Sequence, residues 1–441
     1  MISEPPLREA FVWTWLPGAT EPIVAGRLFP DGQRLQFLYG RSYRERADAL
    51  PLYLPELPLQ AGAIAPLGVM PMASAIRDGA PDAWGRRVIL NRMFGAKGQA
   101  LDGLEADELA FLLGSGSDRI GALDFQGSPT AYVSRGGDQA TLEELLASAE
   151  RVEQNLPLTP ELDQALHHGS SIGGARPKAL IADGPRKYVA KFSSSTDTYA
   201  VVKGEYIAMR LAALAGLSVA PVKLVTVSGK DVLLVERFDR EPAGAGWRRK
   251  AMVSALTILE LDEMQARYAS YQDLAEQIRF RFTDPNATLR ELFARLTLNI
   301  LVGNVDDHAR NHAAFWDGAR LTLTPAYDIC PQARAGEEAS QAMLIVGQQR
   351  SSQIATCIAG AADFHLSADQ AVAIVATQLE IIAAHWAALC DEAGLGLVDR
   401  ALFWGRQFLN PFAFYGLQGA AAALAERARM IRASIQGHRN L

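Results

Sequence analysis

The stretch "LVGNVDDHARNHAAFWDGARLTLTPAYDIC", from Leu301 to Cys330, places two acidic segments on either side of a turn signal. The apolar runs "AAFW" and "LTLT" flank the dipeptide Asp-Gly, which is typical of a β-hairpin turn. Asp306 and Asn311 precede this hairpin and Asp328 follows it, so we expect all three on loops. Loop carboxylates are usually only solvated, but oxygen ligands at this spacing also predict a metal site.

The whole chain has the composition of a globular protein. Its 441 residues are too many for one ordinary core and predict two or three domains. The net charge of −6 predicts no overall field that would attract nucleic acid, although a local patch or a partner could still bind DNA.

Three cysteines, Cys330, Cys357 and Cys390, are widely spaced. A scattered set of odd number argues against a disulfide framework or a cysteine zinc site, and favours a reducing compartment and burial as small apolar residues. The opening "MISEPPLREA" is unlike a signal peptide, and we see no run of about 18 uncharged apolar residues that would predict a membrane span. We therefore expect a cytoplasmic protein.

The first part of the chain, residues 1–125, has the pattern of a mixed α/β subdomain, with a hairpin turn at Asp31-Gly32. The "GSGS" stretch at 114–117 is expected to be a loop rather than a phosphate site, because no strand precedes it and no lysine follows. Residues 126–140 have the composition of a linker. Thr141 and Glu144 have capping-box spacing, so we expect a helix to begin there.

Residues 168–240 are rich in predicted strands. One pair surrounds residues 183–185 and another turns at Ser228-Gly229, with a helix between the pairs. Beyond residue 242 the pattern becomes helical, and one apolar helix is expected to end at Gly303, immediately before the opening stretch. The expected division is an N-terminal subdomain (1–125), the nucleotide-binding part of a β-rich lobe (126–242) and a helical lobe (243–441).

A β-rich lobe followed by a helical lobe, with carboxylates where a helix meets a hairpin, predicts an α+β, two-lobed fold with an all-helical C-terminal lobe and a nucleotide cleft between the lobes.

The segment "SSIGGARPK", residues 170–178, could surround an anion. Gly173 and Gly174 would let the backbone approach closely. Hydroxyl and cationic side chains come from Ser170, Ser171, Arg176 and Lys178. An ordinary flexible loop explains the segment equally well, because it is neither a Walker A nor a G-x-G-x-x-G sequence.

Two further segments fit a nucleotide site. In kinases a strand lysine binds the nucleotide phosphates and a helical glutamate orients it, roles that Lys191 in "YVAKF" and Glu205 could fill. A solvated strand-end lysine is the alternative. The segment "VERFDR", residues 235–240, could present the main chain of Glu236 and Phe238 to adenine, or could be a strand end with a surface ion pair.

The stretch from Leu301 to Cys330 contains the candidate catalytic residues. In kinases a loop Asp accepts the hydroxyl proton, an Asn five positions later binds Mg²⁺, and an Asp after a hairpin binds Mg²⁺ again. Asp306, Asn311 and Asp328 match this spacing. The alternative is a zinc or iron site, for which His308 and His312 would join the two carboxylates.

Glycine loop, strand lysine, helical glutamate, connector, D-x₄-N, hairpin and aspartate follow one another in kinase order. The chain resembles the HipA family of serine/threonine kinases, the toxins of bacterial type II toxin–antitoxin pairs. The resemblance covers roughly residues 65–440. It rests on "GAPDAWGRRVI", "DRIGALDF", "SSIGGARPKAL", "VAKF", "EYIAMRLAALAGL", "LLVERFDR", "LNILVGNVDDHARNHAAFW" and "LTPAYDI".

The resemblance implies a two-lobed, protein-kinase-like fold and a role for each matching residue. Asp306 would be the catalytic aspartate, and Asn311 and Asp328 would bind Mg²⁺. ATP would be bound by Lys178, Gly173, Gly174, Lys191, Glu205, Glu236, Phe238 and His308.

The resemblance also implies regulation and partners. The loop serine Ser171, or its neighbour Ser170, would be an autophosphorylation site, where added negative charge would repel ATP and eject the loop. The partner would be a small helix-turn-helix, HipB-like antitoxin that brings the complex to operator DNA. The substrate would be a component of translation, such as an aminoacyl-tRNA synthetase.

The sequence also departs from the family pattern. Asp307 follows the catalytic position where many relatives carry glycine, which would add a charge near the metal. The segment "YDIC" replaces the "DFG" of eukaryotic kinases, as expected for this family, and residues 1–60 match nothing that we can place.

Other functions remain open from the sequence. A small-molecule kinase of the aminoglycoside or choline type also uses D-x₄-N followed by an aspartate. A catalytically silent corepressor subunit would keep the fold without binding Mg-ATP. Direct DNA binding through the basic tail "ERARMIRASIQGHRN" is a further alternative, although such a helix is more often a solvated face.

Overall fold

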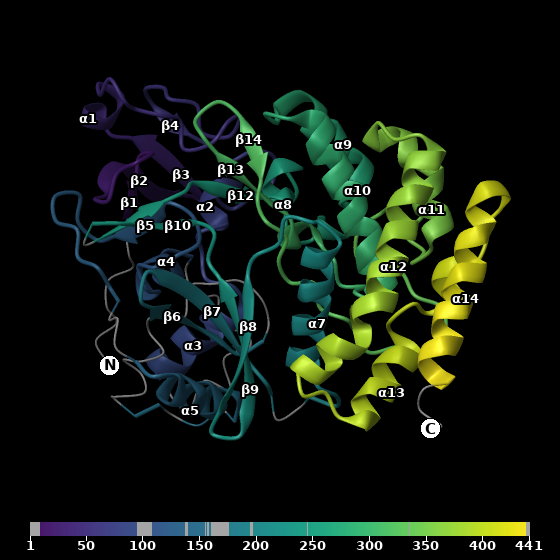
Figure 1. Ribbon diagram of the computed structural model, residues 1–441. Helices are drawn as coiled ribbons and strands as arrows, with labels where there is room; N and C mark the ends of the chain where they lie inside the picture. The colour runs from purple at the N-terminus through teal and green to yellow at the C-terminus, as the bar shows by residue number, and fades with distance from the viewer. Residues whose placement is uncertain are drawn as a thin grey trace. The chain divides into compact units, whose positions relative to one another are not determined.

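The computed structural model describes residues 9–94, 108–136, 140–154, 156, 158–159, 176–194, 197–244, 246–334 and 336–437 (Figure 1). The chain forms two compact units, and each contains several separate segments of the sequence. Unit 1 consists of Met1–Ser194, Val225–Val253 and Phe315–Ala319. Unit 2 consists of Ser195–Leu224, Ser254–Ala314 and Arg320–Leu441. The three-part division at residues 125 and 242 stays a prediction.

The N-terminal part of unit 1 is built on an antiparallel sheet with strand order β4-β3-β2-β1-β5. Its strands are β1 (Ala10–Thr14), β2 (Ile23–Asp31), β3 (Arg34–Tyr39), β4 (Ala63–Ile64) and β5 (Leu123–Gln126). The predicted hairpin between β2 and β3 is confirmed, because Asp31 pairs with Arg34 and Gly32 has a φ of +62°. A positive φ is what a tight hairpin turn requires of its central residues.

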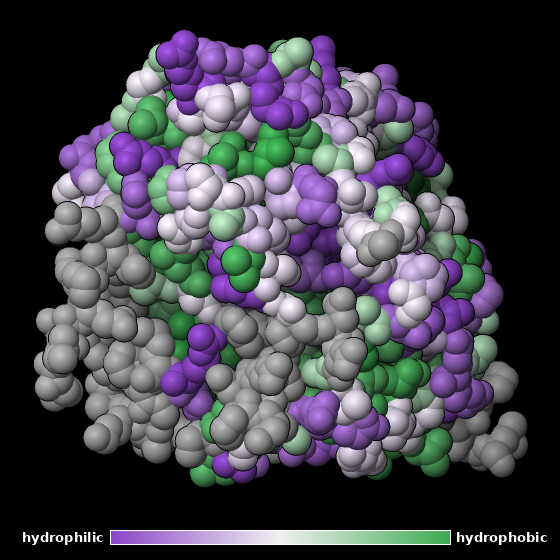
Figure 2. Space-filling model, turned by 90° about the vertical axis from the view of Figure 1, so that its left-hand side faces the viewer, coloured by the Kyte–Doolittle hydropathy of each residue, from purple (hydrophilic) through white to green (hydrophobic). Residues whose placement is uncertain are grey.

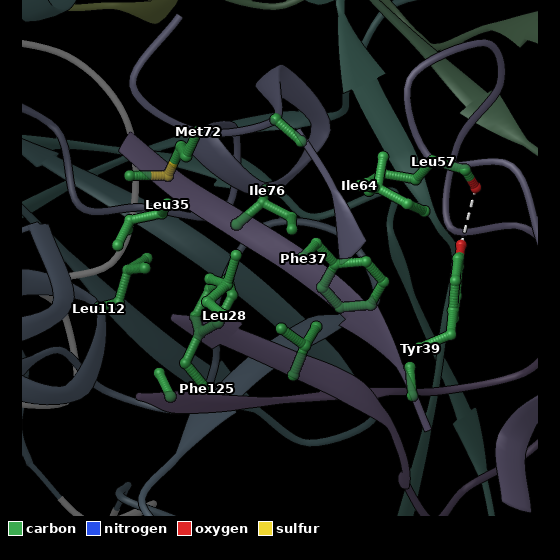
Figure 3. Close-up of a cluster of buried hydrophobic side chains, with 14 of the residues drawn as sticks. Leu28, Leu35, Phe37, Tyr39, Leu57, Ile64, Met72, Ile76, Leu112 and Phe125 are labelled. Carbon is green, nitrogen blue, oxygen red and sulfur yellow. Dashed lines mark hydrogen bonds between the residues drawn. The ribbon is translucent and has the colours of Figure 1, made fainter. Parts of the chain in front are cut away.

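The apolar side chains of this sheet form a core with the short helices nearby (Figure 3). In β3, buried and half-buried residues alternate, so Leu35, Phe37 and Tyr39 all point to the core. The hydroxyl of Tyr39 donates a hydrogen bond to the carbonyl of Leu57 at 2.8 Å. The helices of this part are α1 (Arg41–Arg44), α2 (Ser74–Arg77), α3 (Ala83–Phe94) and α4 (Glu108–Gly114).

A second sheet of unit 1 has the order β6-β7-β9-β8. Its strands are β6 (Lys178–Asp183), β7 (Arg186–Phe192), β8 (Val222–Val227) and β9 (Lys230–Glu236). The turn between β8 and β9 lies at Ser228-Gly229 as predicted, with φ of +48° and +78°. Helix α5 (Leu142–Glu153) packs against β6 and begins with the predicted capping box of Thr141 and Glu144. A separate hairpin joins β10 (Arg240–Ala243) and β11 (Gly246–Arg249).

Unit 2 is largely helical. Its helices are α7 (Val201–Leu214), α8 (Ala255–Ile258), α9 (Tyr271–Arg281), α10 (Pro285–Val302), α11 (Ile354–Ala359), α12 (Ala368–Glu392), α13 (Leu397–Arg406) and α14 (Ala422–Gly437). A small sheet that is not confined to the segments of unit 2 contains β12 (Met252–Ser254), β13 (Ala313–Trp316) and β14 (Leu321–Leu323), in which β13 and β14 pair around the predicted turn at Asp317-Gly318. The chain therefore has the predicted α+β composition.

Two helices of unit 2 lie side by side and organise its core (Figure 1). Helix α10 begins at an Asp284 cap and ends at Gly303, which has a φ of +79°, as the sequence predicts. Helix α12 is long and apolar enough to cross a membrane by length and composition, although no such segment was expected. Its buried face packs against α7, α10 and α14, an arrangement typical of a core helix.

The three cysteines are buried and free, as the sequence predicts.

Candidate active site

The loop that follows α10 is held by a buried asparagine. Asn304 accepts a hydrogen bond from the backbone N–H of Asp306 at 3.3 Å, and its amide donates to Asn299 Oδ1 at 3.0 Å. The same amide lies 3.4 Å from the carbonyl oxygen of Asp328. Asn304 thus connects the end of the helix to both acidic segments of the opening stretch.

Asp306 and Asn311 come together across this loop. The side-chain amide of Asn311 donates to the carbonyl oxygen of Asp306 at 3.1 Å. Asn311 is buried within a short 3₁₀ turn (Ala309–Asn311), whereas the carboxylate of Asp306 stays open to solvent. The D-x₄-N spacing therefore produces one compact loop in which the amide fixes the backbone that carries the exposed carboxylate.

Asp328 has an unusual backbone conformation. Its φ is +60°, in the left-handed region that residues with a Cβ seldom adopt. Holding a non-glycine residue there costs about 1 kcal/mol or more, and such strain concentrates at functional sites. The position follows the β13–β14 hairpin, as the sequence predicts.

The charges around Asp306 raise the pKa of its carboxyl group. Partial desolvation by the surrounding protein is the largest cause, and the neighbouring carboxylates of Asp328 and Asp307 add to it. His308 opposes this effect by lowering the pKa. Asp306, His308 and Asp328 therefore lie close enough to interact electrostatically. These three residues, which the sequence predicts for the site, thus come together in unit 2.

Asp307 has an environment that the sequence did not predict. Its carboxylate is buried and accepts hydrogen bonds from Tyr271, from Asn299 Nδ2 at 2.7 Å and from His312. We expected Asp307 to add a charge near the metal, but its side chain is bonded within the core. Its effect on the pKa of Asp306 is the smallest among the neighbouring charges.

The alternative prediction, a zinc or iron site made by His308, His312 and the two carboxylates, is wrong for the described part of unit 2. His312 Nε2 lies 3.0 Å from Asp307 Oδ1, so this imidazole is bonded to a buried carboxylate. Among the residues that the structure describes, no three His, Cys, Asp or Glu side chains are grouped as a metal site. The remaining ligand set is made of oxygen donors.

In unit 1, two predicted ATP-binding lysines face each other on neighbouring strands. Lys178 of β6 pairs directly with Lys191 of β7, so both side chains lie on the same face of the sheet. Lys178 is buried, and its ammonium group lies 3.4 Å from Asp82 Oδ2. Asp82 belongs to the stretch "GAPDAWG", and a second residue of that stretch also contacts β6. The indole N–H of Trp84 donates to the carbonyl of Lys178 at 3.1 Å.

The predicted connector is a strand end with ion pairs. Glu236 forms an ion pair with Arg186 at 3.2 Å. Its side chain therefore matches the alternative prediction for this segment, a strand end with a surface ion pair. Phe238 packs edge to face on Phe315, with ring centroids 5.9 Å apart. These contacts leave open the predicted role of the main chain in binding adenine.

The remaining predicted residues are not tested by this geometry. Glu205 is buried in α7 of unit 2, whereas Lys191 belongs to unit 1, and their pairing stays a prediction. Gly173, Gly174 and both candidate serines, Ser170 and Ser171, lie outside the described residues.

Sequence reasoning missed a buried charge cluster around this connector. The cluster consists of Asp118, Arg237, Asp239 and Arg240, together with Lys187. It joins the two family-like segments "DRIGALDF" and "LLVERFDR", and the backbone N–H of Gly121 also donates to Asp239 at 2.8 Å. The four charged residues of "VERFDR", at the end of an apolar strand, were the sequence signal that could have revealed this cluster.

The cluster changes the pKa of its carboxylates. Burial alone would raise the pKa of Asp239, but Arg237 and Arg240 outweigh this effect and lower it to about 2. The pKa of Asp118 is likewise well below its usual value, because three arginines and Lys187 outweigh its burial. Both carboxylates are therefore ionised and bind the connector to the N-terminal part of unit 1.

Comparisons with known proteins match two long segments of the chain. A family model of the HipA N-terminal domain matches residues 19–126, and a model of the HipA-like C-terminal domain matches residues 170–386. The candidate kinase Y4mE of Sinorhizobium fredii is 28% identical over 258 residues, which cover 52% of this chain and 59% of that protein. The serine/threonine-protein kinase toxin HipA of Shewanella oneidensis is 25% identical over 183 residues, which cover 36% and 42%.

The chain thus spans about half the length of these curated relatives. A solved structure of Shewanella oneidensis HipA, in complex with HipB and operator DNA, has a TM-score of 0.65 to this chain at 18% identity. That comparison covers 96% of both chains and shows that the α+β fold is kinase-like, as predicted. From the two domain matches and the shared fold, we conclude that the chain belongs to the HipA family of kinases.

Proposed function

We propose that this chain is an ATP- and Mg²⁺-dependent kinase that phosphorylates serine or threonine hydroxyl groups of a protein. The observation that supports it is the convergence of Asp306, Asn311 and Asp328 on the loop held by Asn304. Phosphoryl transfer passes through a loose transition state, so an enzyme contributes mainly position and charge stabilisation. A rigid loop with an exposed carboxylate suits that task.

Asp306 would orient the attacking hydroxyl group. Its carboxylate is exposed, and its backbone is fixed by Asn304 and Asn311, so its position does not depend on the substrate. The raised pKa makes the carboxylate a better proton acceptor than an ordinary aspartate. His308 would keep the carboxylate ionised, because it lowers the same pKa.

The residues fit a magnesium ion. Asn311 and Asp328 provide an amide and a carboxylate oxygen, the hard ligands that Mg²⁺ prefers. The repulsion between Asp306 and Asp328 would be relieved by a cation near both. When bound, Mg²⁺ would neutralise charge on the phosphates.

The nucleotide would contact unit 1 through the face that carries Lys178 and Lys191. Like charges placed directly opposite each other destabilise a sheet, so this pair favours an anion such as a phosphate. Adenine would contact the main chain of Glu236 and Phe238. The other proposed contacts are Gly173, Gly174, Glu205 and His308.

The relatives suggest the biological setting. The solved Shewanella oneidensis structure contains HipA, HipB and operator DNA. We propose for this chain a HipB-like helix-turn-helix antitoxin, contact with DNA only through that antitoxin, and a toxin role in the cytoplasm. The substrate would be a translation protein such as an aminoacyl-tRNA synthetase, and Ser171 or Ser170 would be autophosphorylated.

The test is incorporation of phosphate from labelled ATP with Mg²⁺, followed by mapping of the modified residue. Wild type should label a loop serine, Asp306→Asn should not, and Asp369→Asn should behave as wild type, because Asp369 is exposed at the start of α12. No label with Mg-ATP binding retained would instead favour a small-molecule kinase. No label and no binding would favour a silent corepressor subunit.

A further inference from the structure

Unit 1 contains a cavity that none of the proposed catalytic residues lines. Its volume is about 250 Å³. Its walls come from the β1–β2 connection, from β6, β7, β10 and β11, and from the segment around Tyr132. This volume lies just below the usual range of ligand pockets, about 300–1,000 Å³, and suits one ring with a substituent.

Three aromatic residues wall the cavity: Trp15, Tyr132 and Trp247. The rings of Trp15 and Tyr132 meet edge to face with centroids 5.6 Å apart. The Trp15 indole N–H donates to the carbonyl of Thr20 at 3.1 Å, which fixes that ring. Fixed rings offer flat apolar faces to a planar ligand.

Cationic side chains lie against two of these rings. The guanidinium carbon of Arg249 is 3.4 Å from the ring centroid of Trp15, and Lys187 Nζ is 5.1 Å from that of Trp247. Lys187 also pairs with Asp118 at 2.6 Å, and Arg249 donates to the carbonyl of Ser117 at 2.9 Å. Both cations are therefore held in place before any ligand arrives, which lowers the cost of binding.

The cavity and the charge cluster, part of which lines it, carry a surplus of positive charge. Four cations face two carboxylates: Lys187, Arg237, Arg240 and Arg249 against Asp118 and Asp239. Glu21 at the rim reduces the surplus from two charges to one. A partly desolvated surplus cation favours a bound anion.

We propose that this cavity binds a small organic anion that carries a planar ring. Its phosphate or carboxylate group would lie on Arg249, and its ring would lie against the aromatic walls. The site is separate from the lysine pair proposed for ATP, because Lys187 and Lys191 are four residues apart on β7, roughly 13 Å at 3.3 Å per residue.

The test is calorimetric titration of the full chain with four probes. Phenyl phosphate and phenylacetate carry a ring and an anion, inorganic phosphate lacks the ring, and benzyl alcohol lacks the charge. At least one ring-bearing anion should bind about tenfold more tightly than inorganic phosphate and benzyl alcohol. Which one binds better identifies the anionic group, whereas equal affinity for the neutral alcohol, or no binding by either anion, would overturn the proposal.

The matched variants are Arg249→Gln and Arg248→Gln. Arg248 directly precedes Arg249 in β11 and is exposed, so its replacement removes the same charge without touching the cavity. Arg249→Gln should weaken binding about tenfold and Arg248→Gln should not. If Arg249→Gln does not fold, Trp247→Leu replaces it and should also weaken binding.

A competition experiment separates this site from the nucleotide site. Saturating ATP should leave the affinity for the ring-bearing anion unchanged. Displacement of that anion by ATP, or equal losses in the two arginine variants, would refute a separate anion site. Neither result depends on whether the chain is a kinase.

Discussion

His312 Nε2 lies 3.0 Å from Asp307 Oδ1, and both side chains are buried in unit 2. Asp307 directly follows Asp306, and His312 directly follows Asn311. The pair therefore closes the D-x₄-N loop from inside, while the carboxylate of Asp306 stays exposed. Burial tends to raise the pKa of Asp307, but the interactions with His312, Tyr271 and His308 together outweigh it, and the pKa is lowered.

We expect Asp307→Asn and His312→Gln each to lower the free energy of unfolding by about 3 kcal/mol, because each breaks a buried hydrogen-bonded pair. The double variant should lose less than the sum of the single losses, since the two residues are coupled. Chemical denaturation of the three variants measures this difference. Additive losses would show that the pair does not hold the loop.

The charge cluster of unit 1 predicts a loss of stability in acid. Asp239 has a pKa of about 2 in the folded chain against an ordinary value of 3.8. A lowered pKa stabilises the fold above pH 3.8, and this contribution is lost as the pH falls toward 2. At roughly 1.4 kcal/mol per pKa unit, the full contribution is about 2 kcal/mol, of which about 1 is lost by pH 3.

Denaturation of wild type and Asp239→Asn at pH 6 and pH 3 tests this contribution. The stability difference between the two proteins should shrink at pH 3, because wild type alone loses the ionised carboxylate. Asp369→Asn is the control and should differ from wild type equally at both pH values. A difference for Asp239→Asn that stays constant would contradict the lowered pKa.

Gly303 ends α10 with a φ of +79°, and a Cβ added there would lie 2.8 Å from the backbone oxygen of Gln407. Gly303→Ala should therefore combine backbone strain with a clash and cost about 2 kcal/mol or more. Gly216 is a matched control, because it has a φ of +84° but no atom within 4 Å of an added Cβ. Gly216→Ala should cost only about 1 kcal/mol in the same urea unfolding experiment.

Local sequence signals predicted the elements of this fold because short-range chemistry decides them. The turns at Asp31-Gly32 and Ser228-Gly229, the capping box at Thr141 and the helix end at Gly303 were all confirmed. Each depends on a backbone conformation or a hydrogen bond within a few residues. The spacing of Asp306, Asn311 and Asp328 was informative for the same reason, since one loop and one hairpin connect them.

Contacts between distant segments could not be predicted in this way. The ion pairs of Asp118 with Arg237 and Arg240 join residues more than a hundred positions apart. The burial of Asp307 likewise depends on Tyr271 and Asn299 of two earlier helices. A charged residue beside a predicted site looks like part of that site until the fold shows which way its side chain points.

The left-handed backbone of Asp328 allows strain and function to be separated. Asp328→Gly and Asp328→Ala both remove the carboxylate, so both should lower phosphate incorporation about a hundredfold or more. Only glycine adopts a φ of +60° without steric cost, so Asp328→Gly should be more stable than Asp328→Ala by about 1 kcal/mol. Urea denaturation and labelled ATP measure the two effects on the same preparations. Near-normal labelling by either variant would remove Asp328 from the proposed magnesium site, and equal stability would show that its backbone conformation carries no strain.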